Sequence, residues 1–491
     1  MALINLNTLD DKKIIEEENL IIGSGAGGST IAYELLKNGK NSIILEEGPN
    51  ISSSKDLNIG KSIANFYRNN GATPILSSNG GPLIGYGQGS CVGGSTYVNA
   101  GYFSNTPEWI FNEWSRRDKT ILEYNEFQNL LGEIRNELQV NTEEITHNDG
   151  DSKFLLERSK IINWKIEKCE RFSSGVVGAE KQTMNNSYHK HLLKNKIDII
   201  HNCKVEKIIV RNGNAKSITA LNKINNKTYT FKFKNLFVNC GPINTPQLLS
   251  KNKLIKLDKK IKHFEFHINF KILVKFKKEI NFNHERKFNP DLPLSIFFMR
   301  EFEKEGVLLS SANSELPYLM ATSSHFNDDI KKDIYLNSKN YAMYVYQIKS
   351  NSVGNISSFL NTPFVNYEYN FKDNYEIKKA IQRTSKFFLN NDVEHILYPI
   401  ENSLPIKNIK NSTYLSENFN PKKLHLVSVH GMSSMRPGNS SEFHTNHNGK
   451  VNGYNNIYIN DASILPGNTG ESPQASIMAY AKFIARNLKD N

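Results

Sequence analysis

The pattern of apolar and polar residues near the start of the chain predicts a strand, a helix and a second strand. Residues 20–22 form a short apolar run, which is typical of a buried parallel strand. The segment after it has helical periodicity and ends at Asn38-Gly39, a common C-terminal signal. A second apolar run follows at 43–45, so the order predicts a βαβ unit. The apolar face of its helix consists of Ile31, Ala32, Leu35 and Leu36.

Three glycines lie between the first strand and the helix with the spacing G-x-G-x-x-G. Gly23 permits a tight turn, Gly25 lets the backbone approach a pyrophosphate, and Gly28 lets the helix pack on the strand. The free N–H groups at the start of the helix suit a diphosphate. Glu46 ends the second strand, at the distance where we expect it to accept the hydroxyls of an adenosine ribose. Because all these parts occur in order, they favour a dinucleotide site over a purely structural glycine turn.

The next part of the chain is read as irregular and then helical. Residues 50–80 are polar and predict irregular structure. Residues 106–137 have helical character, and we expect Trp109, Phe111 and Trp114 to belong to the core.

Strand patterns dominate the middle of the chain. The turn at 211–214 predicts a hairpin, and strands are expected at 229–234 and 236–238. Residues 260–372 alternate in strand fashion, which predicts a large antiparallel sheet, and a helix follows near 374–390. The chain therefore combines a nucleotide-type α/β unit with a second, sheet-rich domain.

Further glycine-rich turns and a final helix complete the pattern. Residues 85–101 contain many glycines, which indicates close backbone approach to a flat or charged group rather than a flexible loop. Gly241 follows a buried strand, as in a nucleotide-binding sheet. In the last helix, Ser472 is a candidate N-cap and Pro473 is expected at the first helical position. The expected buried stripe of that helix is Ile477, Tyr480, Ala481, Ile484 and Leu488.

Composition supports a globular protein of two domains. The chain has 491 residues, with 38% hydrophobic and 22% charged residues. Its net charge of +12 comes from scattered lysines without a compact basic block, so we expect no nucleic-acid partner and only a weak preference for anionic partners or substrates. The four cysteines form no C-x-x-C pair, which favours free thiols in a reducing compartment.

The N-terminal segment and the hydropathy pattern bear on location. Residues 1–19 carry acidic residues, including Asp10 and Asp11, and lack the apolar core of a secretory signal. No stretch approaches the ~20 apolar residues of a membrane span. We therefore expect a cytoplasmic protein with no integral membrane segment.

Taken together, these segments resemble the glucose–methanol–choline (GMC) oxidoreductase family of FAD flavoproteins. The resemblance is carried by the glycine fingerprint with Glu46, by 89–99, by 241–249 and by 426–485, which includes Val-His-Gly and Asp-Ala-Ser-Ile-Leu-Pro. It implies an α/β fold with a discontinuous Rossmann-type FAD-binding domain and a substrate domain with a large antiparallel sheet. The implied FAD-binding parts are 1–105, 185–258 and 421–491, with a substrate or cap part at 106–184 and the substrate-binding domain at 259–420.

The resemblance also implies roles for individual residues. His430 occupies the position of the family's active-site histidine, and Ser472 stands where the family commonly has a second catalytic Asn or His. Members with covalent flavin carry a histidine in the second glycine segment, whereas this chain has none at 93–101, so FAD is expected to be non-covalent. No metal is expected. The implied FAD-binding residues are Gly23, Gly25, Ala26, Gly28, Glu46, Gly93, Gly94, Ser95, Asn99, Val205, Asp461, Ala462 and Pro473.

The implied chemistry is oxidation of an alcohol. A base takes the hydroxyl proton while the carbon hydride moves to flavin N5, and histidine suits the first task because its pKa lies near neutrality. His430 is the candidate base, whereas His425, His444 and His447 are read as ordinary structural histidines. Ser472 is predicted to act mainly as a helix cap and less as a substrate ligand.

The sequence leaves several types of reaction open. A dehydrogenase is favoured over an oxidase, while a lyase on the same fold and a non-catalytic flavin protein remain open. The sequence does not decide the electron acceptor, the oligomeric state or the substrate, which could be a sugar, cyclitol, sterol or aliphatic alcohol.

Overall fold

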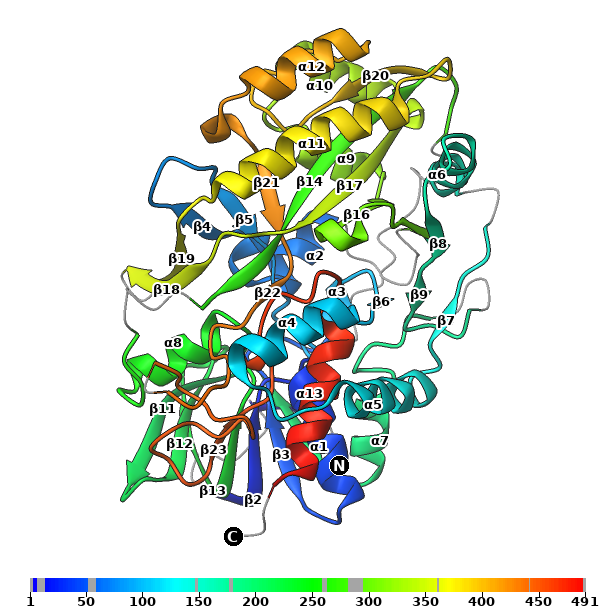
Figure 1. Cartoon of the computed structure of the whole chain (residues 1–491). Helices are drawn as coiled ribbons and strands as arrows, with labels where there is room; N and C mark the ends of the chain where they lie inside the picture. Colours follow the sequence, from blue (N-terminus) through cyan, green and yellow to red (C-terminus); the bar gives the residue numbers. More distant parts are fainter. Residues whose placement is uncertain are drawn as a thin grey trace.

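The computed structural model describes residues 3–6, 14–51, 59–145, 149–175, 180–257, 263–280, 295–359, 362–440 and 442–488. The acidic residues Asp10 and Asp11 lie outside this part of the chain. Two sheets, stacked one above the other in Figure 1, organise the molecule. The first and last parts of the chain meet in the lower half, where α13 lies beside α1.

The first sheet is the α/β unit that the glycine fingerprint predicts. Its parallel part has the order β1, β10, β3, β2, β13 and β23, and the long strand β13 continues into an antiparallel hairpin of β12 and β11. The strands predicted separately at 229–234 and 236–238 form the single strand β13, because its two halves pair with different parts of β2 without a break in direction. The bounds are β1 Leu3–Asn5, β2 Ile15–Ile22, β3 Ser42–Leu45, β10 Asp198–His201, β11 Cys203–Arg211, β12 Asn214–Asn222, β13 Thr228–Val238 and β23 Ile457–Ile459.

Helices cover this sheet and bury its apolar face. Helix α1 packs against α13 and α7, and α13 also packs against α5. The sequence predicts one buried stripe on the last helix, yet nearly every residue from 474 to 485 is buried, because α1, α5 and the short strand β6 (Tyr102–Phe103) pack against it. The bounds are α1 Ala26–Lys37, α4 Glu108–Asp118, α5 Tyr124–Glu137, α7 Tyr188–Lys194, α8 Asn244–Lys251 and α13 Gln474–Arg486.

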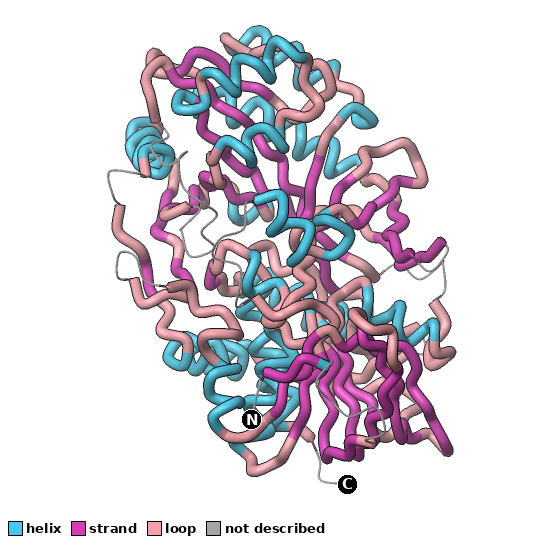
Figure 2. The backbone as a smooth tube through the Cα atoms, turned by 180° about the vertical axis from the view of Figure 1, so that it is seen from behind, coloured by secondary structure: helices cyan, strands magenta, loops and turns pink. Residues whose placement is uncertain are grey.

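The second sheet is larger and mixed rather than purely antiparallel. Its order is β18, β19, β4, β5, β21, β14, β17, β16, β15 and β8, with β20 and β22 also paired to β14, and the pairs β19–β4 and β21–β5 are parallel. Its strands run through the upper half of the molecule, as the view from behind shows (Figure 2). The bounds are β4 Thr73–Ser77, β5 Ile84–Tyr86, β8 Ile166–Lys168, β14 Glu265–Phe276, β15 Phe297–Met299, β16 Val307–Ser311, β17 Tyr341–Lys349, β18 Gly354–Phe359, β19 Thr362–Tyr367, β20 Val393–Leu397, β21 Leu426–Ser428 and β22 Gly431–Met432.

This sheet crosses the domain boundaries expected from the sequence. Strands β4 and β5 belong to the segment 1–105, and β21 and β22 belong to 421–491, yet all four pair within the second sheet. Apart from β4 and β5, which pair with each other, the pairing partners of these strands lie far apart in the sequence, so local periodicity could not reveal them. Helices α11 and α12 pack together on the outer side. The remaining elements are α6 Gly150–Ile161, α9 Leu316–Thr322, α10 Asp328–Leu336, α11 Phe371–Phe388, α12 Ile409–Asn418, β6 Tyr102–Phe103, β7 Asn141–Thr142 and β9 Glu170–Arg171.

Two local predictions are wrong. The region 50–80 is not irregular throughout, because it contains α2 Ile59–Phe66 and the strand β4. Strand β4 is short and pairs with β19, which lies far along the chain, so it has little local signal. Trp109 is 36% exposed and not in the core, whereas Phe111 and Trp114 are buried as expected.

Candidate functional site

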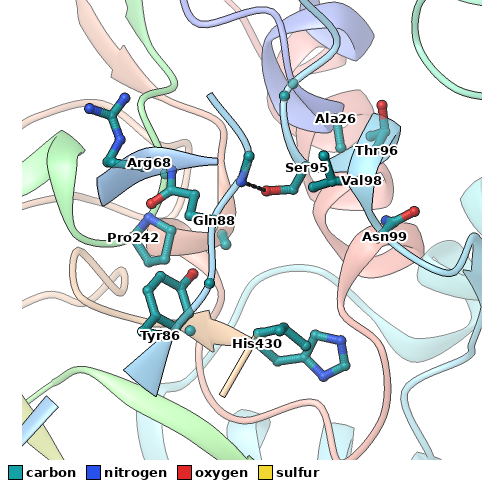
Figure 3. A pocket seen from close by; sticks show the side chains of 18 of the residues that line it. Ala26, Arg68, Tyr86, Gln88, Ser95, Thr96, Val98, Asn99, Pro242 and His430 are labelled. Carbon is teal, nitrogen blue, oxygen red and sulfur yellow. Dashed lines mark hydrogen bonds between the residues drawn. The ribbon is translucent and has the colours of Figure 1, made fainter. Parts of the chain in front are cut away.

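A large cavity of about 710 Å³ lies where the two sheets meet. In Figure 3, Ala26, Ser95, Val98 and Asn99 lie on one side of it, opposite Arg68, Gln88, Pro242 and Tyr86, with His430 below them. Thirteen of the fifteen site residues expected from the sequence line this cavity; Gly28 and Gly93 do not. The thirteen are Gly23, Gly25, Ala26, Glu46, Gly94, Ser95, Asn99, Val205, His430, Asp461, Ala462, Ser472 and Pro473.

The fingerprint glycines are required by close backbone contacts. Gly23 has φ +99°, and a Cβ there would lie 2.2 Å from the carbonyl oxygen of Asn239. A Cβ on Gly28 would lie 2.0 Å from the carbonyl oxygen of Gly23, so Gly28 serves helix packing as predicted, outside the cavity wall. Gly94 has φ +56° and lies against Gly25, to whose Cα a new Cβ would approach within 3.0 Å. The two glycine segments therefore meet directly at the start of α1.

Glu46 joins these two segments through hydrogen bonds. Its Oε2 accepts from the N–H of Ser24 at 3.0 Å and from the Ser24 hydroxyl at 2.7 Å, and its Oε1 accepts from Gly48 N at 2.9 Å. The Ser24 hydroxyl in turn accepts from Gly93 N at 2.9 Å, which is the contact that Gly93 makes instead of lining the cavity. Burial raises the pKa of Glu46, while these hydrogen bonds oppose that rise. Oε1 accepts a single hydrogen bond and keeps a lone pair for a ribose hydroxyl, whereas both lone pairs of Oε2 are already used.

The residues at the start of α1 fit the diphosphate of a dinucleotide. Gly25 is the N-cap of α1, and no side chain caps the free N–H groups in the first turn of this helix. The residues at this helix start line the cavity, so these N–H groups are available to a bound diphosphate. Asn239 also lines the cavity, and neither polar atom of its buried side chain has a hydrogen-bond partner. Uncapped donors and an unpaired buried amide are what a bound polar group would satisfy. The arrangement therefore fits the cofactor that the sequence implies.

Asp461 and Asn99 hold the walls of the cavity in place. The carboxylate of Asp461 accepts from Gly241 N at 2.7 Å and from Ser463 N at 2.8 Å, so it ties the predicted Gly241 turn to the segment before α13. Asn99 Nδ2 donates to Gln474 Oε1 at 2.7 Å. These contacts position Ala462 and the start of α13 beside the cavity.

His430 pairs with a second histidine that sequence analysis did not identify. The Nδ1 atoms of His430 and His267 are 3.0 Å apart, and the two rings meet edge to face. Burial lowers the pKa of His430 to about 4, and burial together with the neighbouring His430 lowers the pKa of His267 well below its usual value. Both rings are therefore neutral at pH 7, and one Nδ1 donates to the other.

The predicted capping role of Ser472 is wrong. Helix α13 begins at Gln474 with Pro473 as its N-cap residue, whose carbonyl accepts from Ile477 N, and it has no side-chain cap because proline has no side-chain oxygen to accept a hydrogen bond. The Ser472 hydroxyl instead faces His430 Nε2 at 3.5 Å. Ser472 and His430 thus present two polar groups to the same part of the cavity.

The polar neighbours of Ser472, Glu471 and Gln474, are already bonded to other side chains and do not face His430 in its place. Glu471 forms an ion pair with Arg300, whose Nη2 lies 3.1 Å from Glu471 Oε2, and Gln474 is bonded to Asn99. Among the described residues, Ser472 is therefore the one whose hydroxyl has a hydrogen-bond contact with His430.

Several cavity residues had no recognisable signal in the sequence. Arg68 lies beside Glu47, with Nη2 2.8 Å from Glu47 Oε2, and Gln88 donates to the carbonyl of Cys240 at 3.0 Å. Gly27 also lines the cavity, and a Cβ there would lie 2.0 Å from the carbonyl oxygen of Asn460, so the position requires glycine. Only Gly27 could have been found, since it lies within the fingerprint.

Two models of the family described as GMC oxidoreductase match residues 18–256 and 358–481. The chain belongs to the GMC oxidoreductase family. An uncharacterised GMC-type oxidoreductase of Sinorhizobium fredii is 23% identical, over 97% of this chain and 95% of that protein. A similar uncharacterised protein of Mycobacterium tuberculosis is 22% identical, over 97% of this chain and 76% of its own length. The GMC match confirms the fold class and the family expected from the sequence.

More distant relatives have named activities. A long-chain-alcohol oxidase of Arabidopsis thaliana is 26% identical over 49% of this chain and 34% of that protein. Formate oxidase of Aspergillus oryzae shares the fold with a TM-score of 0.76 and 13% identity, over 96% of this chain and 98% of that structure. Pyridoxine 4-oxidase from Mesorbium loti has a TM-score of 0.70 and 12% identity, over 96% and 98% of the two chains. At these identities the structures show the fold alone.

Three further observations concern thiols, metals and membranes. All four cysteines are free, as expected, and burial raises the pKa of each thiol. Within the described ranges, no three or more His, Cys, Asp and Glu side chains gather as a metal site would require. No helix in the described part of the chain has the length and apolar character needed to cross a bilayer.

Proposed function

We propose that this GMC oxidoreductase oxidises the CH–OH group of a small-molecule alcohol with non-covalently bound FAD, and that it is a dehydrogenase. The observation that carries the proposal is the placement of His430 Nε2 and the Ser472 hydroxyl in the cavity that the fingerprint glycines also line. We further propose the roles assigned above to the cavity residues, with the first sheet as the FAD-binding part and the second as the substrate part.

FAD, when bound, supplies the acceptor for the hydride that leaves the alcohol carbon. The chain must then take the hydroxyl proton. His430 can do so at Nε2 if its Nδ1–H donates to His267 Nδ1, because this tautomer leaves the Nε2 lone pair directed at the cavity. His267 thus selects the base form of His430, and Ser472 orients the alcohol oxygen between the two side chains.

The proposal is tested by mixing the enzyme with alcohols under anaerobic conditions and following loss of flavin absorbance. General base catalysis contributes ~10² to 10⁴ in rate, so His430→Ala should lose most of that reduction while keeping its flavin spectrum. A near-normal rate in that variant would remove His430 from the mechanism. Turnover without net flavin reduction would favour the lyase alternative.

The mode of attachment has its own test. Acid precipitation should leave a yellow supernatant, because no histidine occurs at 93–101. Flavin retained in the pellet would contradict non-covalent binding.

Oxidase activity is the second candidate. It is favoured by relatives named as oxidases, namely the long-chain-alcohol oxidase, formate oxidase and pyridoxine 4-oxidase. Re-oxidation of the reduced enzyme with O₂ and with artificial acceptors distinguishes the two. Faster re-oxidation by O₂ would replace the dehydrogenase proposal by an oxidase.

A further inference from the structure

Strand β14 carries a row of polar side chains along the substrate side of the cavity. His267 contacts His430, and Asn269 and Lys271 follow at two-residue intervals, so all three lie on one face of the strand. At about 3.4 Å per residue, Lys271 lies about 14 Å along the strand from His267. The row therefore begins at His267, beside the proposed base His430, and ends at Lys271.

The rest of this wall is neutral and has apolar and polar side chains in equal number. Asn269 and Lys271 pair with Gln347 and Val345 of the neighbouring strand β17, and both of these also line the cavity. Among the described lining residues contributed by β14 to β17, Lys271 is the only charged one; the others are Asn269, Phe298, Leu308, Ser310, Ser311, Met343, Val345 and Gln347. The wall thus offers one positive charge to a ligand.

Lys271 has no ion-pair partner among the residues that the structure describes. Lys275, four residues later on the same strand, forms ion pairs with Asp333 at 2.9 Å and Glu394 at 3.4 Å. Burial alone lowers the pKa of Lys271, with no nearby carboxylate to oppose it. Lys271 is half-buried, and an ammonium in such a position without a counter-charge is unfavourable unless a ligand supplies that charge.

Asn269 gives a second sign of a missing ligand. Its side chain is 7% exposed and lines the cavity, and its Oδ1 has no hydrogen-bond partner. Asn269 lies between the histidine pair and Lys271 on β14. Buried polar atoms are usually paired, so this one is free to accept from a polar group of the substrate.

We propose that Lys271 is the anion-binding end of the substrate site, and that the substrate is an alcohol with a carboxylate several bonds from the carbon that is oxidised. This inference rests on the proposed function, because it names the substrate class of the same cavity. The hydroxyl lies at His430 and Ser472, the chain of the substrate follows the neutral wall, and the carboxylate pairs with the Lys271 ammonium.

The test measures binding and turnover separately in the FAD-loaded enzyme. Octanoate, which has no hydroxyl to oxidise, is titrated by calorimetry into the wild type, Lys271→Met, Lys271→Arg and the control Lys277→Met. Lys277 is exposed just beyond β14, so the control removes the same charge without touching the cavity. Turnover is compared as the ratio of kcat/KM for ω-hydroxyoctanoate to kcat/KM for n-octanol.

We expect Lys271→Met to bind octanoate at least about tenfold more weakly than wild type, the scale of one charge-assisted hydrogen bond. The kcat/KM ratio should fall by a similar factor, while Lys277→Met changes neither value and Lys271→Arg retains most of both. Flavin content shows that each variant is folded.

Equal octanoate affinity in wild type and Lys271→Met would overturn the inference, as would an unchanged kcat/KM ratio. The binding result stands apart from the proposed function. If octanoate binding depends on Lys271 but no alcohol reduces the flavin, the anion site is correct and alcohol oxidation is wrong.

Discussion

The lowered pKa of His430 predicts an unusual acid limit for flavin reduction. Burial lowers this pKa to about 4, so the ring that accepts the hydroxyl proton stays neutral well below pH 7. At pH 5, a histidine with pKa 4 is about 90% neutral, whereas one with the ordinary value of 6.5 is about 3% neutral. We therefore expect the anaerobic reduction rate to stay near its plateau from pH 8 to about 5 and to fall by half near pH 4.

Stopped-flow measurement of flavin bleaching at saturating alcohol gives this profile. Burial also raises the pKa of Glu46 and Asp461, so their protonation in acid could release flavin and imitate the loss. Flavin fluorescence recorded at each pH separates release from slower chemistry. His430→Ala should retain only a slow rate that does not follow this titration. A kinetic pKa near 6.5 in the wild type would refute the reasoning, because it would mean that the reacting base is not a buried histidine.

Three further outcomes are expected. Ser472→Ala should slow flavin reduction without the ~0.5–2 kcal/mol loss of stability that removal of a helix cap causes, whereas a lower melting temperature with a normal rate would restore the capping role. His267→Leu should lower kcat at least about tenfold, the scale of one lost hydrogen bond. His267→Gln should recover part of the lost kcat, because its amide oxygen can still accept from His430 Nδ1. Equal kcat values in the two variants would exclude tautomer selection by His267. Gly94→Ala should reduce bound flavin in the purified protein more than Gly39→Ala, because both have positive φ but only Gly94 has a backbone neighbour at 3.0 Å, and equal flavin content would contradict this.

The sequence predicts the parts of this molecule that have a local signal. The fingerprint around Gly23 specifies a strand, a turn and a helix within a few residues, and the structure contains all three. The sequence also predicts the cavity positions of Glu46, which directly follows β3, and of His430, which lies two residues after β21. These features depend on neighbours in the sequence and on motifs that recur.

The remaining parts depend on contacts between distant segments. The periodicity of β14 shows a buried strand, but it cannot show that His267 meets His430, which lies 163 residues later. The Ser-Pro pair before α13 is a common start for a helix, and only the approach of His430 shows that the serine points elsewhere. The burial of nearly all of α13 likewise arises from three packing partners, which a single amphipathic stripe did not anticipate.

The interleaved pairing of the two sheets has a consequence for synthesis. Strand β5 needs β21 as its neighbour, and β13 in the first sheet needs β23, so neither sheet is complete until the last fifth of the chain has left the ribosome. Helix α13 then has to insert against α1, which was made more than 400 residues earlier. During this interval the apolar faces of β2 and α1 lack their cover, which exposes a nascent chain to aggregation. We therefore expect expression to depend on chaperones and on growth temperature, and FAD to become bound only after β21, β23 and α13 have been synthesised.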